Sequence, residues 1–306
     1  MPELPEVQTT VTGLKQHVLG LRICDVWTDY KSSYFKGSET IKDPLYFKRF
    51  KKLLINKKII SAERRAKNIL IGLDNGKTIL IHMKMTGHLL YGHYLFKVSP
   101  KNNPWQPIEP ESLKDPFNRH IHFVITFNNG RRLALSDMRK FAKVTLIDTE
   151  SLHDSEHLNK IGPEPLEKNF TLQKFNERLN LKSNGKIKQV LMNQSIIAGI
   201  GNIYADESLW RAGIHPATIV KNVPANERKN LFNAIKKNLS HGIKLGGDSM
   251  SDYRNIDGEK GKFQEQHSVY QRAGMKCLKK GCGGIITRIV VGGRGTHFCN
   301  EHQSLS

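Results

Sequence analysis

The spacing of apolar residues near the start of the chain predicts a helix. Val7, Val11, Leu14 and Val18 recur at helical intervals, and Gly20 follows where such a helix would end. The first residues of the chain therefore lie at or just before a helix N-terminus.

Alternating apolar and polar positions then predict β-structure. Runs 68–73 and 77–83 form one pair, and runs 120–127 and 131–136 form another. Each pair is joined by a turn that contains Asn-Gly, a strong hairpin signal. Between them, residues 91–116 are rich in Pro, Asn, Lys and Glu, and we expect a long surface loop without a core of its own.

Helical spacing returns after residue 170. The residues that show it are Ile187, Val190, Leu191, the run 203–212, and Leu231, Ala234, Ile235, Leu239 and Ile243. A polar loop, 248–262, follows, and runs 287–291 and 296–299 around Gly292-Gly293-Arg294-Gly295 predict a last β-hairpin. We therefore expect an α+β protein with domains at 1–150, 170–265 and 266–306 and a hinge at 151–169.

The charge of the chain favours a nucleic-acid partner. Lys and Arg number 48 against 28 Asp and Glu, a net charge of +20. Such an excess attracts polyanions, although a solvated basic surface is the alternative. No apolar run approaches the roughly 20 residues of a membrane span, and no signal-peptide pattern precedes Pro2, so we expect a cytoplasmic protein that does not bind membranes.

The N-terminal residues suggest nucleophilic chemistry. Removal of Met1, expected before a small residue, exposes the secondary amine of Pro2, whose pKa the positive end of the helix should lower. Such an amine adds to a sugar's anomeric carbon, and the resulting iminium is an electron sink for phosphate elimination. Glu3 is placed to act as an acid, and Glu6 lies one turn further along. The alternative is a segment that merely caps a helix.

Two other positions suggest phosphate contacts. Lys67 opens a hairpin strand, where it either contacts a phosphate or an extruded base or is solvated. Asn202 follows a glycine-rich turn that opens a helix, a place suited to an anion, and is either a side-chain donor or the N-cap.

The C-terminal hairpin carries a set of residues suited to structural Zn²⁺: Cys277, Cys282, Cys299 and His302. Three thiolates and one imidazole complete a tetrahedral site with no open position for catalysis. His297 competes as the fourth ligand, and reduced cysteines without metal are the alternative. Arg294 at the glycine tip can approach DNA phosphate closely. The remaining cysteine, Cys24, is expected in the core.

These motifs resemble the formamidopyrimidine-DNA glycosylase (Fpg/Nei) family. The matching segments are 1–7, 64–67, 199–207, 213–216 and 291–299. They span nearly the whole chain in the family's order. The resemblance implies an N-terminal β-sandwich flanked by helices, a helix-two-turn-helix domain and a β-hairpin zinc finger, in a monomer that binds damaged double-stranded DNA and works near the bacterial nucleoid.

The resemblance also implies roles for individual residues. It makes Pro2 the nucleophile and Glu3 the general acid, with Glu6 supporting them. Lys67 becomes a catalytic lysine that contacts phosphate, and Asn202 becomes a phosphate ligand. Arg294 is implied in both phosphate binding and the catalytic set.

The resemblance also implies DNA contacts for His120, Met85, Arg139 and Phe141. The last three match the trio that fills the gap left by an extruded base and favour the branch that excises oxidised purines such as 8-oxoguanine. The loop 248–262 resembles the segment that closes over this base. An endonuclease VIII-like pyrimidine-lesion enzyme and a non-catalytic lesion-binding protein are the alternatives. The Cys-x4-Cys spacing and His302 depart from the family's usual four-cysteine finger.

Overall fold

The computed structural model describes residues 1–98 and 103–305, which confirm the α+β class and form two compact units. Unit 1 comprises Met1–Asn159 and Gly246–Lys262, and unit 2 comprises Lys160–Leu245 and Phe263–Ser306. The division at residue 159 falls inside the segment 151–169 where we expected a hinge. Residues 246–262, expected in the helical domain, pack with unit 1 instead. The domain boundaries drawn from the sequence stay predictions.

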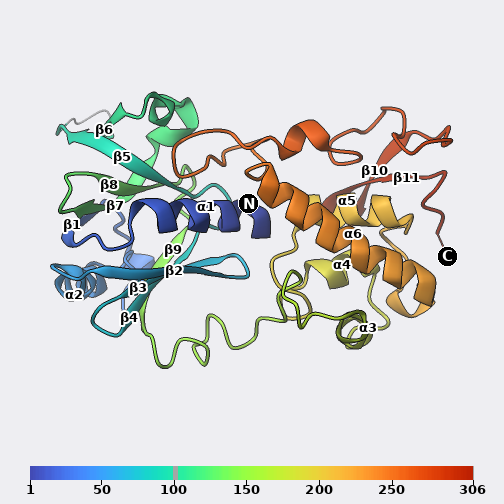
Figure 1. The fold of residues 1–306 in the computed structure, drawn as a ribbon, viewed down its shortest axis with the longest axis horizontal. Helices are drawn as coiled ribbons and strands as arrows, with labels where there is room; N and C mark the ends of the chain where they lie inside the picture. Colours follow the sequence, from blue (N-terminus) through green and yellow to red (C-terminus); the bar gives the residue numbers. More distant parts are fainter. Residues whose placement is uncertain (99–102, 306) are drawn as a thin grey trace. The chain divides into compact units, whose positions relative to one another are not determined.

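Unit 1 is built on two antiparallel sheets with the strand orders β1-β7-β8-β5-β6 and β2-β3-β4-β9 (Figure 1). The helices and strands are α1 (Leu4–His17), β1 (Ile23–Thr28), α2 (Pro44–Leu54), β2 (Ile59–Arg65), β3 (Asn68–Leu73), β4 (Lys77–His82), β5 (His88–Phe96), β6 (Trp105–Glu109), β7 (Ile121–Phe127), β8 (Arg132–Ser136) and β9 (Lys143–Asp148). Both predicted hairpins are confirmed, as β3–β4 and β7–β8. Gly76 and Gly130 take left-handed conformations in their turns, with φ of 72° and 77°.

The main apolar cluster of unit 1 has members from both sheets and both helices, which confirms the sandwich flanked by helices. Val7, Val11 and Leu14 bury one face of α1 in it. Ile256, from the segment after unit 2's long helix, belongs to the same cluster. This burial explains why residues 246–262 pack with unit 1.

Our expectation of a coreless loop at 91–116 is wrong for the part that the structure describes. Strands β5 and β6 pair there, and two short 3-10 helices, Glu111–Lys114 and Pro116–Arg119, follow. Tyr94, Trp105 and Leu113 form a second apolar cluster with residues of β7 and β8. The large apolar residues are too widely spaced among polar ones to show a period in the sequence. Residues 99–102 of this expectation lie outside the described part.

Helix α2 was not predicted, although its signals are present. The side chain of Asp43 caps it, Pro44 begins it, and buried Tyr46, Phe50 and Leu54 recur every four residues. Cys24 on neighbouring β1 is exposed, so its expected place in the core is wrong.

Unit 2 confirms the predicted helices and hairpin, and adds α3. Its elements are α3 (Leu172–Asn180), α4 (Ile187–Met192), α5 (Asn202–Ala212), a 3-10 turn (Val220–Asn222), α6 (Ala225–Lys244), a 3-10 turn (Phe263–Gln266), β10 (Ile286–Val291) and β11 (Arg294–Cys299). Helix α5 ends at Gly213 in the left-handed conformation. No helix in the described parts of the chain combines the length and apolar composition that crossing a membrane requires.

Candidate active site

The N-terminal turn is held in one conformation by a buried carboxylate. Pro2, Glu3 and Glu6 are all buried, and Glu3 is the residue before the first turn of α1. The main-chain N–H of Glu3 donates to Oε2 of Glu6 over 2.7 Å. The other oxygen, Oε1, accepts the N–H of Asp248 over 2.8 Å. Glu6 therefore fixes the turn that carries Pro2 and Glu3, and joins it to residues 246–262 of the same unit.

Burial changes the acidity of this carboxyl group. Loss of solvation, strengthened by the charge of Glu3, raises the pKa of Glu6 to about 7, although the two N–H donors oppose the shift. Tyr253 adds a hydrogen bond from its hydroxyl to the carbonyl of Glu6 over 2.9 Å. The turn thus contains a carboxyl group that changes its protonation state near neutral pH.

Lys67 occupies the tight turn between β2 and β3, and it is 4% exposed. Ala66 beside it has a φ of 52°, which is uncommon for a residue with a side chain. Arg64 bridges this turn to α1, because its Nε donates to Oε1 of Gln8 over 3.0 Å and its Nη1 donates to the carbonyl of Ala66 over 3.0 Å. The hairpin that carries Lys67 is therefore fixed against helix α1, which begins at Leu4.

The structure brings together Met85, Arg139 and Phe141, which are exposed. The Nη1 atom of Arg139 lies 3.1 Å from the sulfur of Met85, and its guanidinium lies 4.5 Å from the centre of the Phe141 ring. Lys84 and Lys140 in the same turns have φ of 56° and 55°. Left-handed backbone at such residues persists only where the surroundings enforce it, so these turns are held under local strain.

A fully buried acid that the sequence did not reveal enforces these turns. Asp137 accepts the N–H of Ala142 over 2.7 Å and the hydroxyl of Thr86, which in turn accepts the N–H of Arg139 over 3.1 Å. The N–H of Asp137 donates to the carbonyl of His120 over 2.8 Å. His120, itself partly buried, therefore adjoins the same turn. Asp137 was missed because an acid at a strand end is usually solvated.

In unit 2, a buried ion pair holds the hairpin tip that presents Arg294. Lys188 on α4 and Asp206 on α5 lie 2.7 Å apart with side chains 0% exposed. Lys188 also donates to the Thr296 hydroxyl over 2.7 Å, and Asp206 accepts the N–H of His297 over 2.9 Å. Arg294 itself is exposed.

Asn202 contacts the same hairpin, because its amide donates to the carbonyl of Gly295 over 3.1 Å. It is the first residue of α5, and the N-cap is Gly201. The alternative in which Asn202 is the N-cap is therefore wrong.

The three cysteines and His302 form the expected metal-binding cluster. Their ligand atoms all lie within 4.8 Å of one another. The distances from Cys277 Sγ to His302 Nδ1, from Cys282 Sγ to the same nitrogen, and from Cys282 Sγ to Cys299 Sγ are 3.5, 3.7 and 3.7 Å. Tetrahedral Zn²⁺ separates such ligand atoms by roughly 3.6–3.8 Å. The set therefore fits one structural Zn²⁺.

The orientation of His302 supports this assignment. Its Nε2 lies 3.1 Å from the carbonyl of Trp210, so this nitrogen donates and Nδ1 presents its lone pair to the cluster. His297 is not part of the cluster, and its Nδ1 instead lies 3.5 Å from Asp206 Oδ2.

The described folds and the cluster define a two-unit protein with a β-sandwich, a helical domain and a zinc finger. Comparison with known families gives the same three parts. Residues 1–144 match the formamidopyrimidine-DNA glycosylase N-terminal domain, residues 161–254 the H2TH domain of the same enzymes, and residues 274–300 a zinc finger found in FPG and IleRS. The chain belongs to the formamidopyrimidine-DNA glycosylase family.

Individual relatives match over the full length. The formamidopyrimidine-DNA glycosylase of Herpetosiphon aurantiacus is 37% identical, covering 99% of this chain and 100% of the relative. A crystal structure of the Lactococcus lactis Fpg (MutM) with DNA containing N7-benzyl-Fapy-dG gives a TM-score of 0.81 at 32% identity, covering 99% of this chain and 100% of that one. The MutM (Fpg) protein of Thermus thermophilus gives 0.78 at 30% identity and covers both chains fully.

We expect Glu6 to make the stability of unit 1 fall as pH rises. The folded-state pKa of about 7 lies above the ordinary value of 4.5, so the contribution is fully present below pH 4.5 and is lost as pH rises through 7. The loss amounts to roughly 3 kcal/mol. Urea unfolding at several pH values between 4.5 and 8 should show this slope, and Glu6→Gln should remove it. Equal pH dependence in the two proteins contradicts the prediction.

We expect His302, and not His297, to hold the metal. His302→Ala should lower the zinc content of purified protein and lead to faster zinc loss to a chelator, whereas His302→Cys should retain zinc because four thiolates also suit it. His297→Ala, the matched control, should keep one zinc per chain. If metal analysis shows zinc loss in His297→Ala and none in His302→Ala, His302 is not the ligand.

Proposed function

We propose that the protein is a bifunctional DNA glycosylase and AP lyase of base excision repair that removes oxidised purines, including 8-oxoguanine and formamidopyrimidines. The main support is the buried N-terminal turn, in which Pro2 and Glu3 are held by Glu6 in a chain of this family. Binding DNA alone does not require an amine beside an acid. A non-catalytic lesion-binding protein is therefore the weaker alternative.

The reaction uses the secondary amine of Pro2 after removal of Met1, whose side chain is exposed. The amine loses its proton and forms a bond to the anomeric carbon of the damaged nucleotide while the bond to the base breaks and the base leaves. The bond between the anomeric carbon and the ring oxygen then breaks and the nitrogen lone pair forms the iminium, with Glu3 protonating the ring oxygen or the leaving base. The resulting iminium carries a positive charge that draws electrons from the neighbouring carbons. The 3′ and then the 5′ phosphate leave by β- and δ-elimination.

The DNA is held by contacts to its phosphates and by filling of the space that the extruded base leaves. Lys67, Asn202 and Arg294 contact phosphates, and Lys67 and Arg294 also belong to the catalytic set. Zinc bound by the three cysteines and His302 fixes the hairpin that presents Arg294 and has no role in the chemical steps.

Extrusion of a base costs a few kcal/mol of stacking and pairing. Met85, Arg139 and Phe141 offset this cost by occupying the gap, and His120 adds a contact near them. The segment 248–262 covers the extruded purine. The protein acts as a monomer on double-stranded DNA in the cytoplasm, at the nucleoid.

Borohydride trapping tests the covalent step. On a duplex containing 8-oxoguanine opposite cytosine, we expect a crosslink that peptide mass spectrometry maps to residue 2. Pro2→Gly replaces the secondary amine by a primary one and should trap far less, and Glu3→Gln should lower the yield because the acid is gone. Tight binding of the lesion without any crosslink in the unsubstituted protein favours the lesion-binding alternative.

Substrate preference tests the purine branch. We expect 8-oxoguanine opposite cytosine to be cut faster than thymine glycol opposite adenine, because the exposed trio matches the purine-lesion branch. Single-turnover rates on the two duplexes at the same salt concentration give the comparison. Faster cutting of thymine glycol reverses the assignment in favour of an endonuclease VIII-like enzyme.

A further inference from the structure

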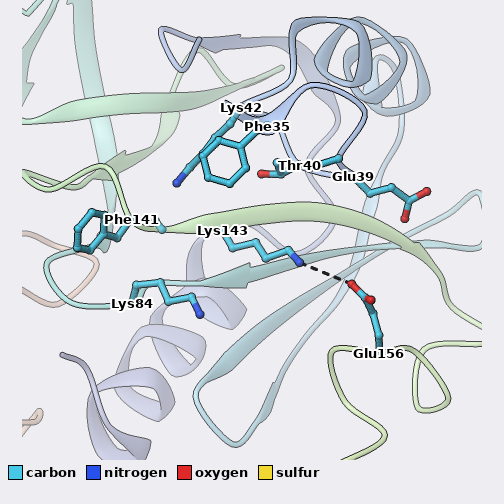
Figure 2. A pocket seen from close by; sticks show the side chains of 10 residues that line it. Phe35, Glu39, Thr40, Lys42, Lys84, Phe141, Lys143 and Glu156 are labelled. Atoms are coloured by element: carbon cyan, nitrogen blue, oxygen red, sulfur yellow. Dashed lines mark ion pairs between the residues drawn. The ribbon is translucent and has the colours of Figure 1, made fainter. Parts of the chain in front are cut away.

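A cleft of about 570 Å³ opens in unit 1 beside the exposed trio Met85, Arg139 and Phe141. Its lining includes Phe35, Thr40, Lys42, Lys84, Phe141 and Lys143 (Figure 2). The cleft therefore shares Phe141 with the trio, and Lys84 directly precedes Met85. Its volume lies within the range of pockets that hold small organic molecules.

The cleft gathers more positive charge than its own acids neutralise. Lys42, Lys84 and Lys143 face two glutamates, Glu39 and Glu156, both exposed. Lys143 reaches Glu156 only at 4.0 Å, and within the described chain Lys42 and Lys84 have no ion pair inside 4 Å. Burial lowers the pKa of Lys42; the charge of Asp137 opposes this shift, and the weaker effect of the Lys84 charge acts in the same direction as burial. Crowded ammonium groups of this kind favour an anion.

A second observation points to a ligand with hydrogen-bond acceptors or donors. Thr40 is 4% exposed, and its buried hydroxyl finds no hydrogen-bond partner anywhere in residues 1–98 and 103–305. An unsatisfied buried hydroxyl is costly, and a phosphate oxygen would satisfy it.

The aromatic lining points to a base next to that anion. Phe35 and Phe141 contribute rings to the cleft, and the Nζ of Lys42 lies 5.0 Å from the centre of the Phe35 ring. Nucleobases stack on aromatic side chains, whereas a free inorganic anion gains nothing from them. A phosphate joined to a nucleobase fits both parts of the lining.

We propose that this cleft binds one phosphate of a DNA strand and the base next to it. Lys84, Lys143 and the Thr40 hydroxyl hold the phosphate, and the base packs on Phe35. The inference rests on the proposed function, because the DNA that the trio enters would bring a strand to Phe141 and Lys84. A free nucleotide has the same chemistry and is the alternative source.

The test measures affinity for an uncleavable duplex that carries a tetrahydrofuran abasic analogue. Fluorescence anisotropy should show about tenfold weaker binding for Lys143→Met and for Thr40→Val. The slope of log Kd against log salt should fall by about 1 in Lys143→Met. Lys52→Met removes an exposed lysine of α2 outside the cleft and should change Kd by no more than about twofold. Thermal melting confirms that each variant is folded.

A scan with single methylphosphonates identifies the phosphate. At one position, removing the phosphate charge should weaken binding by the unsubstituted protein, and the same change should not weaken binding by Lys143→Met any further.

The proposal is overturned if the two losses of affinity are additive at every position, or if the cleft variants bind the duplex as tightly as Lys52→Met does. Binding of deoxyadenosine monophosphate that Thr40→Val abolishes, with duplex affinity unchanged, assigns the cleft to a free nucleotide instead.

These outcomes are separate from the proposed chemistry. Affinity for the uncleavable duplex does not require Pro2 to react, so absence of the borohydride crosslink refutes the glycosylase mechanism without altering the cleft result. A crosslink at residue 2 together with unchanged affinities in the cleft variants refutes only the cleft.

Discussion

Buried carboxylates that accept main-chain N–H groups hold the functional segments of this protein in place. Glu6 accepts from residues 3 and 248, Asp137 from Ala142, and Asp206 from His297. Glu207, next to Asp206, accepts the N–H groups of residues 268, 269 and 270. A main-chain hydrogen bond to a charged acceptor stabilises a fold by about 1.5–3 kcal/mol, although at Glu6 burial opposes the charged form. Losing any of these acceptors leaves buried N–H groups unsatisfied. Glu6, Asp137 and Glu207 thus fix turns or loops outside the regular helices and strands, and Asp206 fixes strand β11 at His297.

This arrangement is consistent with a net charge of +20. A protein that binds a polyanion benefits from exposed lysine and arginine, and exposed acids would weaken that attraction. The supporting acids Glu6, Asp137 and Asp206 lie inside, where they do not oppose the ligand from the surface. There they organise the segments that carry Pro2, the exposed trio and the hairpin tip. The left-handed residues Ala66, Lys84 and Lys140 indicate strain in the turn that carries Lys67 and in the turns that carry the trio Met85, Arg139 and Phe141, and the surrounding hydrogen bonds and packing maintain it.

The sequence predicted those parts whose signals are local. Asn-Gly turns gave both hairpins of unit 1, helical spacing gave α1 and α4 to α6, and cysteine spacing gave the metal cluster. The roles of Pro2, Glu3 and Lys67 came from residue chemistry together with the family's motifs. The supporting acids Asp137 and Asp206 could not be predicted, because their burial depends on chain segments far away in sequence. The same applies to the cleft, whose lining comes from residues 35–42, Lys84, 141–143 and Glu156. The cluster around Trp105 was missed because its members are widely spaced in a polar stretch.

The C-terminal hairpin needs two separate interactions to hold it, one at each end. An isolated two-stranded hairpin is at best marginally stable in water, and β10–β11 is such a sheet. Zinc fixes the end that carries Cys299, but the tip with Arg294 lies at the opposite end of β11, five residues away along an extended strand. There Lys188 and Asn202 bond to the carbonyl of Gly295, and Asp206 bonds to the strand at His297. The metal cluster therefore holds the end of β11 that carries Cys299, and the buried ion pair on α4 and α5 holds the end that presents Arg294 within unit 2.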